Sequence, residues 1–245
     1  MSCAGVPGRS KMRFLASLLL AFAAAGSASA ASLVNGSFEQ PGTSSLVYLT
    51  AGSTALPGWT VVDSTPGGDN EIAYTNSAAF GGLGVVASHG SHFLELTGVT
   101  GRGKGVKSDA IDTVAGTTYR VGFDVGAFFV GGQGSYGDVT LDLLVDDVLA
   151  GSFTNALGLS TAGSDWQRFS YDVVASGPSM RLTFLASTAL TSSYLGAGLD
   201  NVTFDALPGQ PSGSPGSVPE PGAWVLMILG FGLAGSSLRR QVRLA

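Results

Sequence analysis

Between residues 120 and 186 the chain contains four stretches in which apolar residues alternate one by one with polar or small residues. In the clearest stretch, Val121, Phe123 and Val125 are separated by Gly122 and Asp124. Successive side chains of a β-strand point to opposite faces, so this pattern predicts strands with one buried face. The four stretches are 120–125, 140–145, 168–173 and 181–186.

Shorter segments rich in β-branched and aromatic residues fill the rest of the central region, with Gly, Ser and Asn turns between them. They predict further strands at residues 33–38, 46–50, 59–62, 71–74, 92–96, 106–114, 148–154 and 199–204. No helical periodicity occurs outside the two ends of the chain. Many short strands separated by turns predict one all-β domain, a jelly-roll β-sandwich, over residues 31–205.

The first 30 residues have the three parts of an export signal. Arg9, Lys11 and Arg13 are positively charged, an apolar run follows at 14–25, and Ala28-Ser29-Ala30 is a small-residue cleavage site. Met12 is an alternative start. Removal of this signal peptide also removes Cys3, the only cysteine, so the mature chain is expected to have no disulfide, thiol nucleophile or cysteine metal site.

The predicted mature domain and its spacer are acidic. Residues 31–217 contain six Lys or Arg against 16 Asp or Glu, a net charge of about −10. Nucleic acids and anionic membrane surfaces attract basic proteins, so neither is an expected partner. Neutral partners and divalent cations suit this charge better.

The C-terminal region begins with a spacer and continues into an apolar run. Residues 206–217 are rich in Pro, Gly and Ser, which predicts a flexible linker. Residues 222–238 carry no charge and, as a helix rising ~1.5 Å per residue, would span ~26 Å, enough for a single transmembrane helix. Arg239, Arg240 and Arg243 follow and are expected on the cytoplasmic side, which places the domain outside.

Residues 218–245 resemble the bacterial PEP-CTERM sorting tag, in the subclass with a Trp three residues after the second Pro. The matching residues are Pro219, Glu220, Pro221 and Trp224, followed by Arg239 and Arg240. Val225 and the looser arginine end differ from the usual pattern. The resemblance implies recognition and cleavage by an exosortase-type membrane protease, and delivery to the cell envelope or extracellular matrix. An ordinary single-pass membrane anchor is the alternative.

The domain itself resembles the choice-of-anchor C family of exported bacterial proteins, which is similar to galactose-binding-like jelly rolls. The resemblance rests on an ordered set of short motifs: Val34–Glu39, Leu56–Trp59, Gly90–Leu96, Gly116–Tyr119, Trp166 and Gly198–Val202. It implies binding of a sugar or cell-wall polymer, although a fold alone does not establish a function. A structural matrix or surface protein without a specific ligand is the alternative.

The same resemblance implies a structural Ca²⁺ ion between the first and last strands. By position, its carboxylate ligands would be Glu39 and Asp200. Calcium needs several oxygen ligands, some of them backbone carbonyls that a sequence does not show. The alternative is that Glu39 caps a turn and Asp200 hydrogen-bonds to a neighbouring strand.

Sugar binding needs aromatic faces for stacking beside polar groups. Phe128, Phe129, Tyr136 and Tyr194 all lie in predicted Gly- or Ser-rich loops and are the candidate ligand-binding residues. A hairpin loop packed on the edge of the sandwich is the alternative for these residues. Trp59 and Trp166 begin strands and are more easily explained as core residues.

Nothing in the sequence indicates catalysis. The G-x-G-x-x-G match at 132–137 is followed by no helix, which excludes a dinucleotide-binding loop. His89 and His92 lie in and after a predicted turn, Asp146-Asp147 is typical of a hairpin turn, and no G-x-S-x-G motif is present. The sequence therefore predicts a protein that is not an enzyme.

Overall fold

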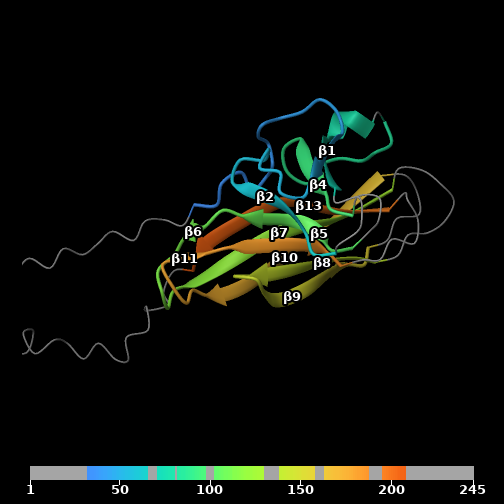
Figure 1. The fold of residues 1–245 in the computed structure, drawn as a ribbon. Helices are drawn as coiled ribbons and strands as arrows, with labels where there is room; N and C mark the ends of the chain where they lie inside the picture. Colours follow the sequence, from blue (N-terminus) through green and yellow to red (C-terminus); the bar gives the residue numbers. More distant parts are fainter. Residues whose placement is uncertain are drawn as a thin grey trace, which may run out of the picture.

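The computed structural model of the chain describes residues 32–65, 71–80, 82–97, 102–129, 138–157, 163–187 and 195–207. These residues form two antiparallel sheets packed face to face (Figure 1). The strands are β1 (Val47–Thr50), β2 (Trp59–Asp63), β3 (Glu71–Asn76), β4 (His92–Glu95), β5 (Lys104–Ser108), β6 (Ile111–Asp112), β7 (Thr118–Phe129), β8 (Val139–Val145), β9 (Val148–Asn155), β10 (Gly163–Val174), β11 (Ser179–Met180), β12 (Leu182–Ala186) and β13 (Leu195–Ala206), and a short 3₁₀ helix covers Ser77–Phe80.

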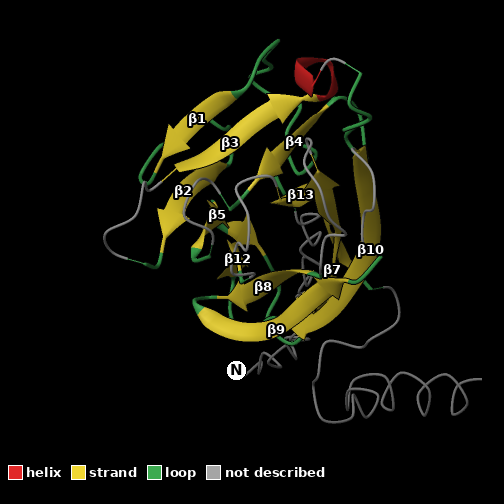
Figure 2. Cartoon of the chain, turned by 90° about the vertical axis from the view of Figure 1, so that its right-hand side faces the viewer, coloured by secondary structure: helices red, strands yellow, loops and turns green. Residues whose placement is uncertain are grey.

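The six-stranded sheet has the order β1-β3-β4-β13-β7-β10, and the five-stranded sheet has the order β2-β5-β12-β8-β9. Figure 2 shows the first sheet arching from β1 round to β10 with the second sheet facing it. β6 and β11 form a separate two-stranded pair at the end of the sandwich where β13 finishes. The predicted all-β sandwich is confirmed.

The core lies between the two sheets and is built from the alternating positions of the long strands. Val121, Phe123 and Val125 of β7 are fully buried there. The ring of Phe123 packs edge-on against Phe184 of β12 from the opposite sheet, with 4.9 Å between the ring centroids. The apolar face predicted from the alternation is therefore the face that closes the sandwich.

The segment predicted as a first strand at residues 33–38 is instead a pair of turns. Asn35 and Phe38 have left-handed backbone conformations, with φ of 53° and 55°, and a strand does not continue through such residues. Between them, Gly36 lies so close to β13 that a Cβ would stand 2.0 Å from the Val202 carbonyl oxygen. The prediction of a strand here was wrong.

The prediction of one strand over residues 106–114 was also wrong, because the chain changes sheets inside it. β5 ends at Ser108, and the Asp109 backbone N–H makes the last in-register hydrogen bond next to β2, to the Gly58 carbonyl. The chain then pairs as β6 with β11. By contrast, the hairpin turn predicted at Asp146-Asp147 is confirmed between β8 and β9, with φ of 49° and 66° at the two residues.

β13 ends at Ala206, one residue inside the predicted linker. No helix within the described ranges is long and apolar enough to cross a membrane. The predicted signal peptide and the predicted membrane span at 222–238 both lie outside these ranges.

Candidate functional site

The loop of residues 82–91 crosses the outer face of the six-stranded sheet. Val85 of this loop packs on Phe93 and Trp166 in a small apolar cluster separate from the main core. The Trp166 indole Nε1–H donates to the Val86 carbonyl oxygen at 2.7 Å, and Ser164 Oγ donates to the same oxygen at 2.9 Å. The 82–91 loop is therefore tied to strand β10 at this point.

Asp200 of β13 holds the middle of the same loop. Its carboxylate is fully buried and accepts hydrogen bonds from the Ser88 and His89 backbone N–H groups, each at 2.9 Å, and from the Ser88 hydroxyl at 3.0 Å. The Asn201 N–H adds a fourth at 2.6 Å. Burial raises the pKa of Asp200 from 3.8 to about 6, against the opposing effect of these hydrogen bonds.

Glu39 holds the end of the loop, where it enters β4. Its carboxylate accepts hydrogen bonds from the Ser91 N–H and hydroxyl, at 2.9 and 3.0 Å, and from the His92 N–H at 2.9 Å. It also lies 2.9 Å from His92 Nδ1. Partial burial alone would raise the pKa of Glu39, but the hydrogen bonds from His92 and Ser91 outweigh it and lower the pKa to about 2.

His92 is a structural residue in this arrangement. Its ring stacks on Tyr74, with 5.5 Å between centroids, and its Nε2 lies 3.0 Å from the Thr43 backbone nitrogen. The predicted turn before it is present, with Gly90 in a left-handed conformation whose φ is 66°. A Cβ at position 90 would stand 2.3 Å from Glu39 Oε1, so the tight approach of this carboxylate requires glycine.

The N-terminal turns complete the arrangement. The Trp59 indole N–H donates to the carbonyl oxygens of Val34 and Asn35, at 3.0 and 3.2 Å. The Val202 N–H donates to the Gly36 carbonyl oxygen at 2.8 Å. Trp59 is 1% exposed, which confirms the prediction that it is a core residue.

We refer to residues 34–39, 88–92 and 200–202 together as the motif latch. These are the segments that carry most of the family resemblance, and the fold brings them to one place. There, their carboxylates, amides and hydroxyls bind one another. The prediction that Glu39 caps a turn describes this geometry, and Asp200 plays the same role for the 88–89 part of the loop.

Glu39 and Asp200 hold different parts of one loop, and each already accepts four hydrogen bonds. In the part of the chain that the structure describes, no three His, Cys, Asp or Glu side chains are grouped so that they could hold a metal ion. A Ca²⁺ ion on these two carboxylates therefore stays a prediction, and its binding would displace some of the N–H and O–H donors.

A second polar cluster lies farther along β10, beside the bulge of β13. Arg168 donates to Asp124 Oδ1 at 3.1 Å, to the Asn201 carbonyl oxygen at 2.6 Å and to Thr203 Oγ1 at 3.1 Å. Asn201 in turn donates its side-chain N–H to Asp124 Oδ2 at 3.0 Å. The register shift of β13 between Asp200 and Thr203 exposes the Asn201 carbonyl for this contact.

Glycines on β7 leave room for large side chains of β10 to lie close to the sheet. A Cβ at Gly126 would stand 2.6 Å from the Trp166 ring, and a Cβ at Gly122 would stand 2.5 Å from Arg168 Nη2. Sequence reasoning missed this cluster. The only sequence signal for it is the pair Gly122 and Gly126 in one strand, together with Trp166 and Arg168 in another.

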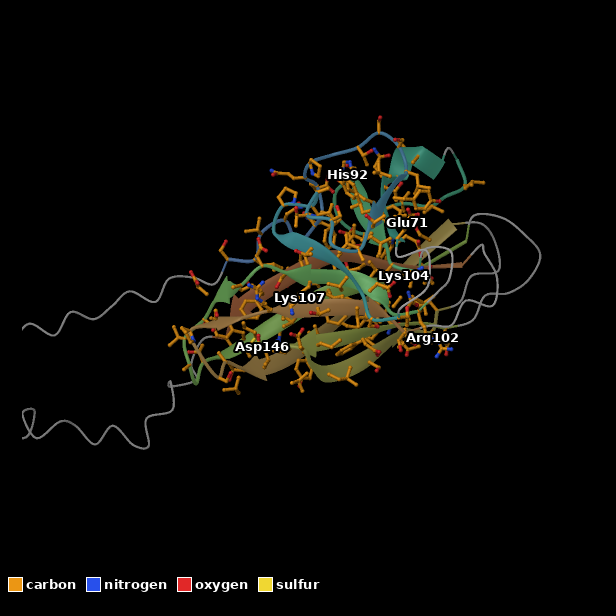
Figure 3. All side chains as sticks on the ribbon, viewed as in Figure 1. Glu71, His92, Arg102, Lys104, Lys107 and Asp146 are labelled. Carbon is orange, nitrogen blue, oxygen red and sulfur yellow. The ribbon has the colours of Figure 1, made fainter. Side chains whose placement is uncertain are left out.

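The structure places two of the four predicted ligand-binding aromatics, Phe128 and Phe129, and it places them in a strand rather than in the predicted loop. Phe128 and Phe129 are the last residues of β7, and their register partners are Ser164 and Gly163 on one side and Gly196 and Leu195 on the other. Tyr136 and Tyr194 lie outside the described residues, as do the sorting residues Pro219, Glu220, Pro221, Trp224, Arg239 and Arg240. Figure 3 shows that the labelled His92 lies well apart from the labelled Asp146 of the β8–β9 turn.

Two cyclases share this fold. The Stig cyclase Fisc from Fischerella sp. TAU, solved in complex with (3Z)-3-(1-methyl-2-pyrrolidinylidene)-3H-indole, is similar with a TM-score of 0.52 at 17% identity, over 75% of this chain and 100% of that chain. An apo cyclase from Fischerella sp. is similar with a TM-score of 0.51 at 19% identity, over 75% of this chain and 98% of that chain. At these identities the likeness shows the β-sandwich fold alone.

A carbohydrate-binding module, TmCBM61 in complex with beta-1,4-galactotriose, is similar with a TM-score of 0.42 at 15% identity, over 71% of this chain and 97% of that chain. No curated protein sequence matches the chain. One sequence family does match part of it, at the C-terminal end. Residues 217–241 match the PEP-CTERM protein-sorting motif, so the chain carries the tag of an exported, sorted protein.

Proposed function

We propose that this protein is sorted by an exosortase-type membrane protease and binds polysaccharide in the envelope or extracellular matrix. The binding surface is the end of the sandwich opposite to the sorting segment. Before processing, the C-terminal helix anchors the chain in the inner membrane with its C-terminus in the cytoplasm. The sorting motif at 217–241 supports sorting by the protease. The register of β7 and β13 supports the location of the binding surface.

The observation that carries the binding proposal is the pairing of Phe129 with Leu195. The β7–β8 connection follows Phe129 and contains Tyr136, and the β12–β13 connection precedes Leu195 and contains Tyr194. Because Phe129 and Leu195 are neighbours across two strands, both connections leave the sandwich side by side. The register therefore supports one binding surface at this end of the domain.

The chain leaves the sandwich toward the linker at the other end. β13 runs for 12 residues from Leu195 to Ala206 before it reaches the linker, and at ~3.3 Å per residue this separates the two ends by ~40 Å. An anchored chain would thus present the aromatic end away from the membrane. The acidic surface fits a ligand held by stacking and hydrogen bonds, and it makes nucleic acid an unsuitable partner.

We also propose that the domain is not an enzyme. Glu39 and Asp200 are used in holding the 82–91 loop, and Asp124 is paired with Arg168. The likeness to cyclases concerns the fold and transfers no reaction. A structural matrix protein without a ligand is a second candidate, favoured by one observation: the motif residues that converge in the fold bind one another.

Intact-mass measurement of the protein recovered from the envelope tests the sorting proposal. We expect the mass of a chain that begins near Ala31 and has lost the segment after Pro219–Pro221. Mature protein that still contains residues 222–245 would make the segment a plain membrane anchor.

Retention on immobilised neutral polysaccharides tests the binding proposal. We expect the exported protein to be retained by at least one of them, and the double variant Phe129→Ala, Tyr136→Ala to be retained less. A parent protein retained by none of them would support the structural candidate.

A further inference from the structure

Arg168 has an unusually fixed guanidinium group for a residue on the outer face of a sheet. Its Nη1 donates to Asp124 Oδ1 and to the Asn201 carbonyl, and its Nη2 donates to Thr203 Oγ1. The group also lies close to Gly122, where a Cβ would stand 2.5 Å from Nη2 and 2.7 Å from Thr203 Oγ1. Three hydrogen bonds hold this cation in one orientation, and the missing side chain of Gly122 leaves room for it.

Two N–H donors of the Arg168 guanidinium take no part in these three hydrogen bonds. A guanidinium has five N–H groups, and its Nε–H and one Nη2–H lie side by side as a fork that fits two oxygens in one plane. Among the described residues, Arg168 Nε donates to no acceptor, and Nη2 donates only to Thr203. The side chain is 44% exposed. The fork therefore has donors, a fixed plane and access to solvent.

Arg120, one strand over on the same sheet, shows what such a fork binds in this protein. Its Nε donates to Asp172 Oδ1 at 2.7 Å, and its Nη2 donates to Asp172 Oδ2 at 2.8 Å. Both oxygens of one carboxylate fill the fork. Arg168 lies opposite Asp124 in the register of β10 and β7, but its Nε carries no such partner.

We propose that the free fork of Arg168 binds the carboxylate of an acidic sugar. This inference rests on the proposed polysaccharide-binding function and adds a second contact to it. Arg168 lies four residues along β10 from Ser164, the register partner of Phe128, a distance of ~13 Å at ~3.3 Å per residue. Trp166 lies between them on the same face, partly exposed and fixed by its hydrogen bond to Val86.

The domain is acidic, so an acidic sugar is repelled by its other carboxylates unless these are paired, buried or screened by salt. Asp124 is already bound by Arg168 and Asn201, and Asp200 is buried and accepts hydrogen bonds from the 82–91 loop. Asp172 is paired with Arg120. At physiological salt, exposed charges farther away than ~8 Å are largely screened, so the repulsion of the acidic domain weakens while the direct contact remains.

The experiment compares retention of the exported protein on polygalacturonate and alginate gels with retention on the same polymers after reduction of their carboxylates to hydroxymethyl groups, in 0.15 M salt. We expect retention on at least one carboxylated gel to exceed that on its reduced form. Arg168→Lys keeps the charge but has no fork, so we expect its binding to be about tenfold weaker. Arg120→Lys, whose parent fork is filled by Asp172, is the matched control and should bind like the parent.

Three results would overturn the proposal: equal retention on carboxylated and reduced polymers, equal retention of Arg168→Lys and parent, or no retention of the parent on any carboxylated gel. If the parent binds a neutral polysaccharide and fails on the carboxylated gels, only the Arg168 contact is wrong. If it binds neither, the proposed function fails as well.

A second measurement keeps the test independent of how well the variant folds. In the parent protein, galacturonate should shift the Nε–H resonance of Arg168 and leave that of Arg120 unchanged. An unchanged Arg168 resonance at saturating galacturonate would contradict the contact.

Discussion

The motif latch and the Arg168 cluster lie on the same face of the six-stranded sheet, but they differ in whether their polar groups are used up. In the latch, Glu39 and Asp200 each accept four hydrogen bonds from the loop and strands around them. At Arg168, three hydrogen bonds fix the cation and two donors remain. The segments that stand out in the sequence therefore hold the fold, and the group with spare binding capacity lies outside them.

The difference predicts two classes of variant. Changes in the latch remove buried contacts and should lower stability. Changes at Arg168 or at the aromatic end should lower binding and have smaller effects on stability. The largest effects are expected in the latch.

Trp59→Ala should have the largest effect. The indole is 1% exposed, packs on Phe38 with 5.4 Å between ring centroids, and binds the N-terminal turns through its N–H. We expect a loss of ~3–5 kcal/mol in the free energy of unfolding, measured by urea titration. Val148→Ala, at a position that is 70% exposed, is the control and should change it little. Equal effects of the two substitutions would contradict the placement of Trp59.

The two loop-holding carboxylates should respond to pH in opposite directions. Asp200 has a pKa of about 6 when folded and 3.8 when unfolded, so its contribution to stability is present in full below pH 3.8 and is lost as the pH rises through 6. A shift of this size corresponds to roughly 3 kcal/mol. In Asp200→Asn, the dependence of the unfolding free energy on pH between 4 and 6 should be flatter than in the parent.

Glu39 has a pKa of about 2 when folded and 4.5 when unfolded, so its contribution is present above pH 4.5 and is lost as the pH falls toward 2. Glu39→Gln should therefore flatten the acid side of the same curve and leave the region between pH 5 and 6 unchanged. If both substitutions flatten the same side, the contrast between the buried and the partly exposed carboxylate is wrong.

Calcium tests whether the latch works through hydrogen bonds alone. An ion held by Glu39 and Asp200 in the folded state would stabilise that state by mass action. If it is bound, a chelator should lower the Tm of the parent and leave the Tm of Asp200→Ala unchanged. A parent Tm that does not respond to the chelator would exclude the ion and leave the hydrogen bonds as the whole explanation.

The strands of the sandwich could be predicted from the sequence because side-chain alternation is a local property. The alternating residues from Val121 to Val125 identified the buried face of β7 correctly. The same reasoning failed at residues 33–38, because the left-handed conformations of Asn35 and Phe38 depend on the contact between Gly36 and Val202 in the last strand. The alternation of residues 33–38 contains no information about Val202, which is more than 160 residues later in the chain.

The contacts of the candidate site were less predictable from the sequence, because they also join residues that are far apart in the chain. Glu39 and Asp200 were predicted as a pair of calcium ligands, which stays a prediction, but the 82–91 loop that both of them bind was not predicted as their partner. Arg168 was missed because its fixed orientation depends on the Asn201 carbonyl, which is free only because of the bulge in β13. A bulge of this kind has no clear signature in the residues that form it.

One paired measurement tests whether the structural latch is separate from the binding surface. Retention on the polysaccharide that binds the parent best, and Tm, are measured for Asp200→Ala and for the double variant Phe129→Ala, Tyr136→Ala. We expect Asp200→Ala to lower the Tm and keep its retention at temperatures where it is folded. The double variant should keep its Tm and lose retention about tenfold or more, the effect of losing stacking contacts worth ~1–3 kcal/mol. Loss of retention in Asp200→Ala with an unchanged Tm, together with full retention in the double variant, would contradict the account.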